Sequence, residues 1–197
     1  MRRPVYSKPR LTAELLLPGS LVGVVAAIAV AGLALLAGLS VAYAVVAALA
    51  LGVPLSLFGA GYNFLLARGH VRLGGITPAV GYWLVGYVVS RVIHAVTLDI
   101  FLGQPIGLGE GVVPFLVFQA LVAVGFAVGF VWLHEHAAPL WWLRIRDHNP
   151  VAASYVAAYT QQAAHMQQKK DTQKARRKGG ETEQRPASLK RTRRRPG

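Results

Sequence analysis

The stretch SRVIHAVTLD, residues 90–99, places Arg91, His94 and Asp99 inside a long apolar segment. On a helix that turns about 100° per residue, Arg91 and His94 share one polar face, and valines occupy the opposite side. A charge turned toward lipid costs at least about 2.5 kcal/mol, so this face should point into a helix bundle. At about 1.5 Å per residue, Gln119 on the next helix reaches the depth of Arg91 and is predicted to hydrogen-bond its guanidinium. The predicted intramembrane polar stripe contains Arg91, His94, Asp99 and Gln119.

Two interpretations of this stripe remain open. In the first, Arg91 and His94 form an internal hydrogen-bonded network that fixes how two helices dock. In the second, an aqueous cavity exposes them to a proton, an anion or a polar substrate, because ionisable groups inside a membrane are often functional. Asp99 lies near the outer end of its helix, where we expect it to reach water or to help neutralise Arg91 through water.

Other chemistry is not indicated. The chain has no cysteine, which excludes disulfides, thiolate metal sites and a cysteine nucleophile. In residues 134–136 two histidines flank a glutamate, but side chains two apart on a helix point about 200° from one another, so a site with His148 is not expected. The segment instead fits an interfacial collar ahead of Trp141 and Trp142. We predict no catalytic residues, no metal and no cofactor, and hence a protein that is not an enzyme.

Apolar runs set the fold class. The 197 residues are 54% hydrophobic yet carry a net charge of +13, so the apolar and basic parts must be segregated. One run has room for two membrane crossings of about 20 residues each, and two later runs have room for one each. The prediction is an all-α polytopic membrane protein, a four-transmembrane-helix bundle with a cytoplasmic amphipathic helix and a disordered basic tail. The expected parts are a basic N-terminal segment (1–14), the transmembrane domain (15–137), an interfacial segment and cytoplasmic helix (138–178), and the tail (179–197).

Loop charge predicts the orientation. Basic residues occur before the first crossing, between the second and third, and after the fourth, whereas the other two loops have none. Because Lys and Arg near helix ends resist translocation, this alternation predicts a multi-pass protein of the cell membrane with both termini in the cytoplasm.

Small residues recur at every fourth position of the early crossings, a spacing that lets two membrane helices approach closely. A Gly-x-x-x-Gly pair in the fourth crossing is a weaker signal of the same kind. These ladders predict packing within the chain, with a dimer interface as the alternative. The predicted helix-packing residues are Gly19, Gly23, Ala48, Gly52, Gly125 and Gly129.

The C-terminal segment has two predicted halves. Asn149 and Pro150 look like a helix cap and first helical residue, and the mildly amphipathic helix that follows should end at Gly179 and Gly180. Residues 166–197 hold twelve Lys and Arg, three acidic residues and no aromatic residue, which predicts disorder at the far end. Its expected partners are anionic lipid headgroups, nucleic acid or a ribosome, or an acidic protein. The predicted anion-binding residues are Lys169, Lys170, Arg176, Arg177, Lys178, Arg191, Arg193, Arg194 and Arg195.

Three functions fit this sequence. The leading hypothesis is a non-enzymatic membrane scaffold or accessory subunit that docks other membrane proteins and engages an anionic partner through its basic tail. The second is a membrane anchor for nucleic acid, in DNA transfer or ribosome docking. The third is a small transporter or insertion factor that uses the polar stripe.

Overall fold

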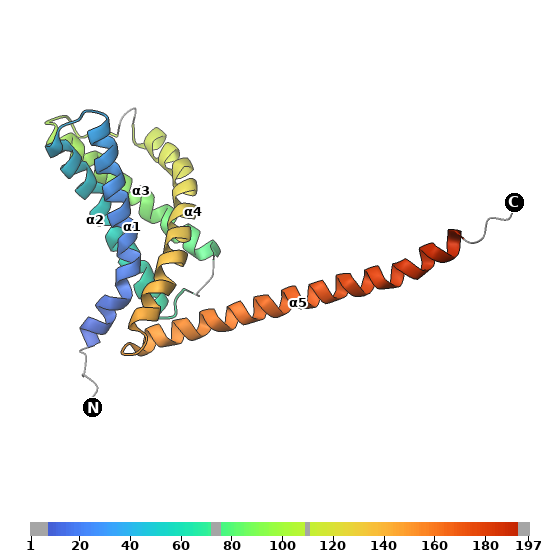
Figure 1. Cartoon of the computed structure of the whole chain (residues 1–197). Coiled ribbons are helices and arrows are strands. Elements are labelled where there is room, and N and C mark those ends of the chain that lie inside the picture. Colours follow the sequence, from blue (N-terminus) through green and yellow to red (C-terminus); the bar gives the residue numbers. More distant parts are fainter. Residues whose placement is uncertain (1–7, 72–75, 109–110, 193–197) are drawn as a thin grey trace. The chain divides into compact units, whose positions relative to one another are not determined.

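The computed structural model describes residues 8–71, 76–108 and 111–192, which fold into five α-helices and short connections. The described residues form helices and no strands, which confirms the predicted all-α class, and the first four helices are long and apolar enough to cross a membrane. The chain divides into two units, Met1–Tyr155 and Val156–Gly197. The helices are α1 (Lys8–Leu36), α2 (Val41–Ala67), α3 (Ile76–Phe101), α4 (Val112–Ile145) and α5 (Pro150–Thr192) (Figure 1).

Helices α1 and α2 form an antiparallel hairpin joined by a tight turn. Gly38 adopts a φ of 76°, a left-handed conformation that glycine tolerates at little cost. Ser40 then caps α2, because its Oγ accepts a hydrogen bond from the Tyr43 backbone N–H at 3.2 Å. The short turn therefore places the start of α2 directly beside the end of α1.

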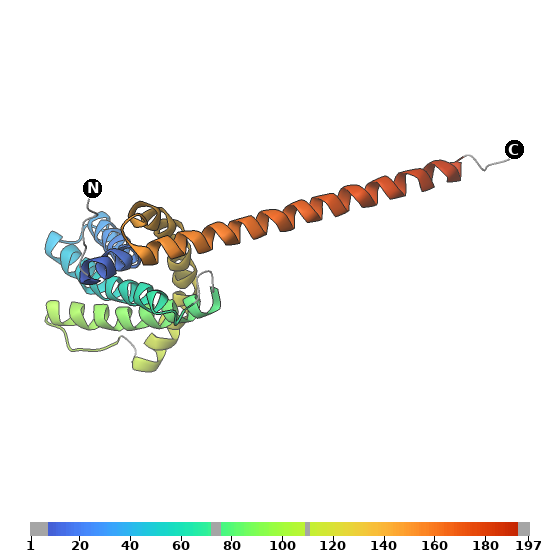
Figure 2. The same cartoon turned by 90° about the horizontal axis from the view of Figure 1, so that it is seen from below.

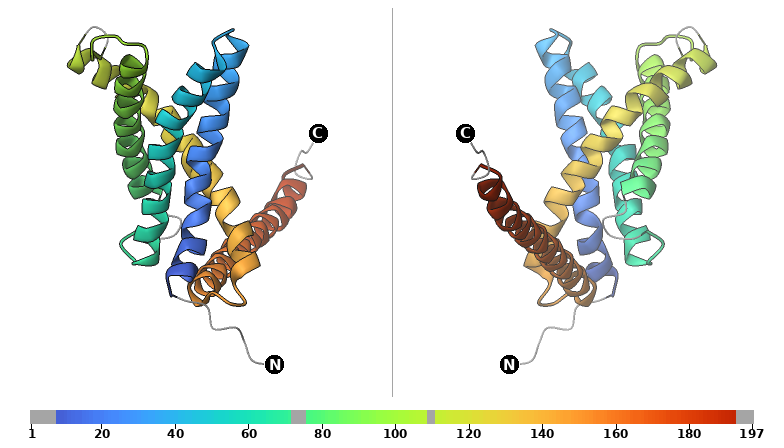
Figure 3. Two further views of the ribbon diagram at one scale, coloured as in Figure 1. Left: turned by 90° about the vertical axis from the view of Figure 1, so that its left-hand side faces the viewer. Right: turned by 90° about the vertical axis from the view of Figure 1, so that its right-hand side faces the viewer.

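The first four helices are arranged in two layers. Helix α2 lies between α1 and α3 (Figure 2). Helix α4 crosses this layer obliquely and contacts α3 near one end and α1 near the other (Figure 3). We call the end with the start of α1 and the end of α4 the basal end, and the end with the α1–α2 turn the apical end.

Glycines at the α1–α2 interface bring the two backbones into contact. A Cβ atom on Gly19 would overlap the backbone carbonyl of Gly59, and one on Gly23 would overlap the backbone of α2 beside Ser56. The close approach also lets the Ser56 hydroxyl donate to the carbonyl oxygen of Ser20 at 3.0 Å. The predicted residues Gly19, Gly23, Ala48 and Gly52 therefore belong to tightly packed positions of the hairpin, Ala48 being buried and Gly52 lying against Ala27.

Gly125 and Gly129 of α4 do not pack within the chain as expected, and the alternative that they form a dimer interface stays a prediction. Gly125 and Gly129 are exposed, and a Cβ atom on either would meet no atom within 4 Å among the described residues. The small residues that α4 packs inward are Ala123 and Ala127, both fully buried. Two pairs with the same four-residue spacing lie on different sides of this helix, and spacing alone does not say which side faces the bundle.

The core of the bundle lies where α4 crosses the other helices. Trp83 and Leu55 are fully buried there, and the Trp83 ring lies 5.2 Å from the ring of Phe130. Ala123 and Ala127 leave room for these large side chains, so that α4 approaches α3 closely. The core cluster consists of Val22, Leu51, Leu55, Trp83, Tyr87, Ala123, Ala127 and Phe130.

Three predicted boundaries fall inside helices. Helix α1 begins at Lys8, so it runs through the boundary expected at residues 14 and 15. Helix α4 continues past residue 137, through Pro139, to Ile145. Helix α5 continues past residue 178 to Thr192. The first two predicted boundaries lie where the apolar sequence begins and stops. A helix can continue beyond such a point, because it ends only where its backbone hydrogen bonds end.

Candidate functional site

Arg91 is held inside the bundle by two neutral side chains. Its Nε donates to the Oε1 of Gln119 at 3.1 Å, which confirms the hydrogen bond expected from helix depth. Its Nη1 donates to the Nδ1 of His94 at 2.8 Å. Arginine has no acceptor atom, so His94 must accept through Nδ1 and carry its proton on Nε2. The structure thus joins three of the four predicted stripe residues into one buried or half-buried network.

Asp99 does not join this network. Its Oδ2 accepts a hydrogen bond from the backbone N–H of Gly107 at 3.0 Å, so the carboxylate organises the connection that follows α3. None of the ion pairs found among the described residues includes Arg91. The guanidinium charge is therefore positioned by dipoles, without a carboxylate from the described part of its own chain.

A second buried polar network, which was not expected from the sequence, joins α1, α2 and α4. The amide nitrogen of Asn63 donates to the carbonyl oxygen of Leu15 at 2.9 Å, and Asn63 Oδ1 lies 2.6 Å from the Nε2 of His134. Because Oδ1 is an acceptor, His134 must donate through Nε2. Asn63 and His134 are each only 1% exposed, so this network is shielded from solvent more completely than the Arg91 network.

The helical register of α4 was the signal that could have identified His134. Ala123, Ala127, Phe130 and His134 follow one another at spacings of four, three and four residues and are all buried. That is the spacing of a single inward-facing helix seam. The seam continues into Ala138 and Trp142, which are fully buried, so Trp142 does not belong to an exposed interfacial collar as predicted.

The three histidines considered for a metal site lie in different surroundings. His134 faces Asn63, and exposed His136 lies with its Nδ1 2.7 Å from the carbonyl oxygen of Trp132. His148 lies against Glu14 of α1. Among the described residues no group of three potential ligands is close enough to hold a metal ion.

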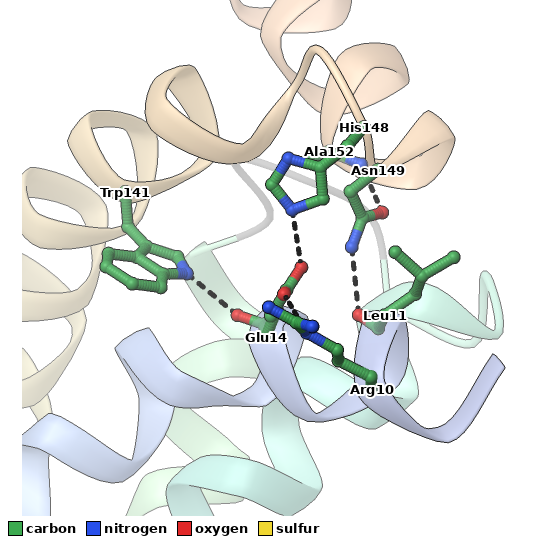
Figure 4. A network of polar contacts seen from close by, with 7 residues as sticks. All are labelled: Arg10, Leu11, Glu14, Trp141, His148, Asn149 and Ala152. Atoms are coloured by element: carbon green, nitrogen blue, oxygen red, sulfur yellow. Dashed lines mark hydrogen bonds and ion pairs between the residues drawn. The ribbon is translucent and has the colours of Figure 1, made fainter. Parts of the chain in front are cut away.

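Glu14 connects the start of α1 to the end of α4 at the basal end (Figure 4). Its Oε2 lies 2.8 Å from the Nε2 of His148, and its Oε1 accepts from the Nε of Arg10 at 3.3 Å. Its backbone carbonyl accepts from the indole N–H of Trp141 at 2.8 Å. The carboxylate and the backbone of one residue therefore bind two separate parts of the α4–α5 corner.

Asn149 caps α5 and attaches it to α1 at the same corner (Figure 4). Its Oδ1 accepts from the backbone N–H of Ala152 at 3.3 Å, which confirms the predicted cap, and its Nδ2 donates to the carbonyl oxygen of Leu11 at 2.9 Å. Tyr155 packs with its ring 4.7 Å from that of Trp142. Burial raises the pKa of Tyr155 to about 12, so the phenol stays neutral at physiological pH.

Replacing Asn149 with alanine should loosen this corner. The change removes a helix cap, which costs about 1 kcal/mol, together with the bond to Leu11. We expect faster amide hydrogen exchange in residues 151–153, measured by mass spectrometry on the purified protein. Ser154→Ala is the control, because exposed Ser154 bonds only to the carbonyl of Val151 in its own helix. Equal exchange in the two variants would contradict the capping role.

Helix α5 passes through the expected stop. Gly179 and Gly180 lie inside it, and the backbone is helical to Thr192, so the predicted disorder from residue 179 differs from the structure. Each glycine costs about 1 kcal/mol relative to alanine, and the residues on both sides are largely Lys, Arg, Gln and Glu, which favour helices.

Three of the basic residues of α5 have described side chains. Lys169, Lys170 and Lys174 are exposed and lie about 140° apart around the helix at most. Arg176, Arg177, Lys178 and Arg191 belong to α5, but their side chains lie outside the described part of the structure. Arg193, Arg194 and Arg195 follow the described residues.

In comparisons with known proteins, the chain matches no protein-family model, no curated protein and no solved structure.

Proposed function

We propose that this protein is a non-enzymatic membrane scaffold, a four-helix anchor that presents the basic helix α5 to an anionic partner. The observation that carries the proposal is the exposed lysine cluster on α5, Lys169, Lys170 and Lys174, in a segment with twelve basic and three acidic residues. Helical backbone holds these charges at fixed spacings, whereas a free chain would have to be ordered when it binds.

The proposal places the protein in the cell membrane with the basal end and α5 in the cytoplasm. Its support is the distribution of basic residues, which flank the basal ends of the crossings and are missing from the two apical connections. A cytoplasmic α5 would meet nucleic acid, acidic proteins and the anionic inner leaflet.

Phosphate or carboxylate contact is the expected mode of binding. Residues 166–197 contain no aromatic side chain and therefore offer no surface on which bases can stack. Attraction through Lys and Arg alone releases counterions, so the affinity should fall steeply as salt rises. The first experiment is to purify the protein in mild detergent, with and without nuclease, and to identify what co-purifies. Recovery of the bare protein under both conditions would count against the scaffold.

Neutralising three exposed lysines should weaken binding in a measurable way. We expect Lys169→Gln, Lys170→Gln and Lys174→Gln together to lower affinity for a duplex DNA probe by the full-length protein in neutral nanodiscs. The logarithm of the binding constant falls as the logarithm of the salt concentration rises. Each lost phosphate contact should make this slope less steep by about 0.9, so the loss of three contacts should change it by about 2 to 3. The measurement is fluorescence anisotropy across a salt series.

The matched control changes the same helix without changing its charge. Gln161, Gln162 and Gln167 are exposed on α5, and their replacement by alanine should leave the slope unchanged. Equal slopes for the lysine variant and the glutamine variant would remove the lysine cluster from the binding surface. Binding to vesicles of an anionic lipid with no binding to DNA would assign the cluster to the membrane surface.

A further inference from the structure

One amino group of Arg91, Nη2, has no hydrogen-bond partner among the residues that the structure describes. The Nε and Nη1 atoms are engaged by Gln119 and His94, and no hydrogen bond to Nη2 occurs in the described part of the chain. The side chain is half-buried, so the guanidinium lies at the edge of the bundle. Its two neutral bonds fix the plane of the guanidinium while leaving its charge uncompensated, because no ion pair found among the described residues includes it.

The edge of α3 around Arg91 has the pattern of a helix-binding seam. Leu84 and Val88 lie seven and three residues before Arg91, and both are half-buried because they pack partly against the core of the bundle. Ala95 and Leu98 lie four and seven residues after Arg91 and are also half-buried. Alternating steps of four and three residues keep side chains facing a second helix that crosses at a small angle. Arg91 is the central position of this seam.

The described residues of a second copy offer no suitable counter-ion. Of the described acidic residues in the four spanning helices, Glu14 lies near the start of α1, Asp99 two residues before the end of α3, and Glu135 sixteen residues past Gln119 on α4, about 24 Å from the level of Arg91. Arg91 lies ten residues before Phe101, about 15 Å from that end of α3. A carboxylate at this depth must come from a different protein.

We propose that the Arg91 edge of α3 binds a transmembrane helix of another membrane protein that carries an Asp or Glu near the bilayer centre. The proposal rests on the scaffold role and adds the chemistry of the partner. Burial in lipid strengthens an ion pair between Arg91 and a carboxylate, and the apolar seam on both sides of Arg91 supplies the packing. The fixed guanidinium geometry makes the pairing specific for an acidic residue at this one depth.

The test uses model helices in place of the unknown partner. The full-length protein in phosphatidylcholine bicelles is mixed with a labelled Leu/Ala peptide of about 20 residues that has one central Asp, or with the same peptide carrying Asn. Energy transfer reports association. We expect the Asp peptide to bind the wild type about tenfold more tightly, which corresponds to about 1.4 kcal/mol, and the preference to disappear in Arg91→Gln. Arg91→Lys should keep part of it, because the charge remains.

Controls separate the site from general effects. Arg68→Gln removes a cation at the end of α2, where the guanidinium lies 4.7 Å from the Phe64 ring centre, and should leave the preference intact. Size-exclusion chromatography and circular dichroism check folding, and Arg91→Lys keeps the test valid if Arg91→Gln does not fold. Equal binding of the two peptides, or a preference that persists in Arg91→Gln, would overturn the proposal.

Two further arms of the experiment test a lipid headgroup and the α5 lysines as the source of the preference. Loss of the preference when phosphatidylglycerol is added would assign Arg91 to a lipid headgroup and would also overturn the proposal. The variant with Lys169, Lys170 and Lys174 neutralised should bind the Asp peptide as the wild type does, because these lysines lie on α5. Failure of the Arg91 site can therefore be told apart from failure of the α5 function.

Discussion

Gly19→Val is expected to destabilise the bundle strongly. A side chain at Gly19 would overlap the backbone carbonyl of Gly59, and a backbone atom cannot rotate aside as a side chain can. The helices must therefore separate along the α1–α2 interface. Overpacking costs typically 1–3 kcal/mol, and with backbone contact we expect about 3 kcal/mol. The measurement is unfolding by sodium dodecyl sulfate in mixed micelles, followed by circular dichroism.

Gly32→Val is the matched control for this prediction. Gly32 belongs to the same helix, and a Cβ atom there would meet no atom within 4 Å among the described residues. The substitution is the same and the change in helix propensity is similar, so only the contact with α2 differs. We expect Gly32→Val to change the unfolding free energy by less than about 0.5 kcal/mol. Similar losses in both variants would show that α1 and α2 are not in contact at Gly19.

Asn63→Leu should have the second largest effect. The change removes the acceptor for the Nε2–H group of His134, a residue that is 1% exposed, and the described residues supply no other hydrogen bond to this group. An unsatisfied buried polar group costs about 1–3 kcal/mol. We therefore expect a loss of about 2 kcal/mol in the same unfolding measurement. Thr97→Val should cost little, because the Thr97 hydroxyl bonds only to the carbonyl of Ile93 in its own helix.

A double-mutant cycle isolates the pair. His134→Phe removes the donor, and the combined variant with Asn63→Leu removes both polar groups at once. The double variant should lose less stability than the sum of the single variants, with a coupling of about 1–2 kcal/mol. Additive losses would show that Asn63 and His134 do not depend on one another.

Helix geometry explains what the sequence could predict. The rise per residue is constant, so counting from the helix starts placed Gln119 at the level of Arg91, and the two side chains are hydrogen bonded. Close packing needs small residues, so a ladder that included Gly19 and Gly23 identified the hairpin interface. Both predictions depend on distances along one helix or on residue size, which are properties of the local sequence.

The missed features depend on which way a helix faces and where it ends. His134 and Trp142 follow the apolar run and were interpreted as interfacial, but α4 continues as a helix and turns both inward. Gly125 and Gly129 have the spacing of a packing pair but lie on an exposed side of α4, because the bundle packs Ala123 and Ala127 inward instead. Glu14 gave no signal, since its partners Trp141 and His148 are more than 120 residues away in the chain. Contacts between distant segments are set by the packing of the whole bundle.

The bonds from Leu11 and Glu14 to Asn149, Trp141 and His148 have a practical consequence for work with this protein. They attach the start of the amino-terminal helix to the corner where the carboxy-terminal helix begins. An affinity tag that disturbs the start of α1, or a deletion that includes Glu14, will therefore also remove the contacts that hold the first turn of α5. Purification handles belong beyond Thr192, and any loss of activity after amino-terminal trimming should first be checked for damage at the opposite end of the sequence.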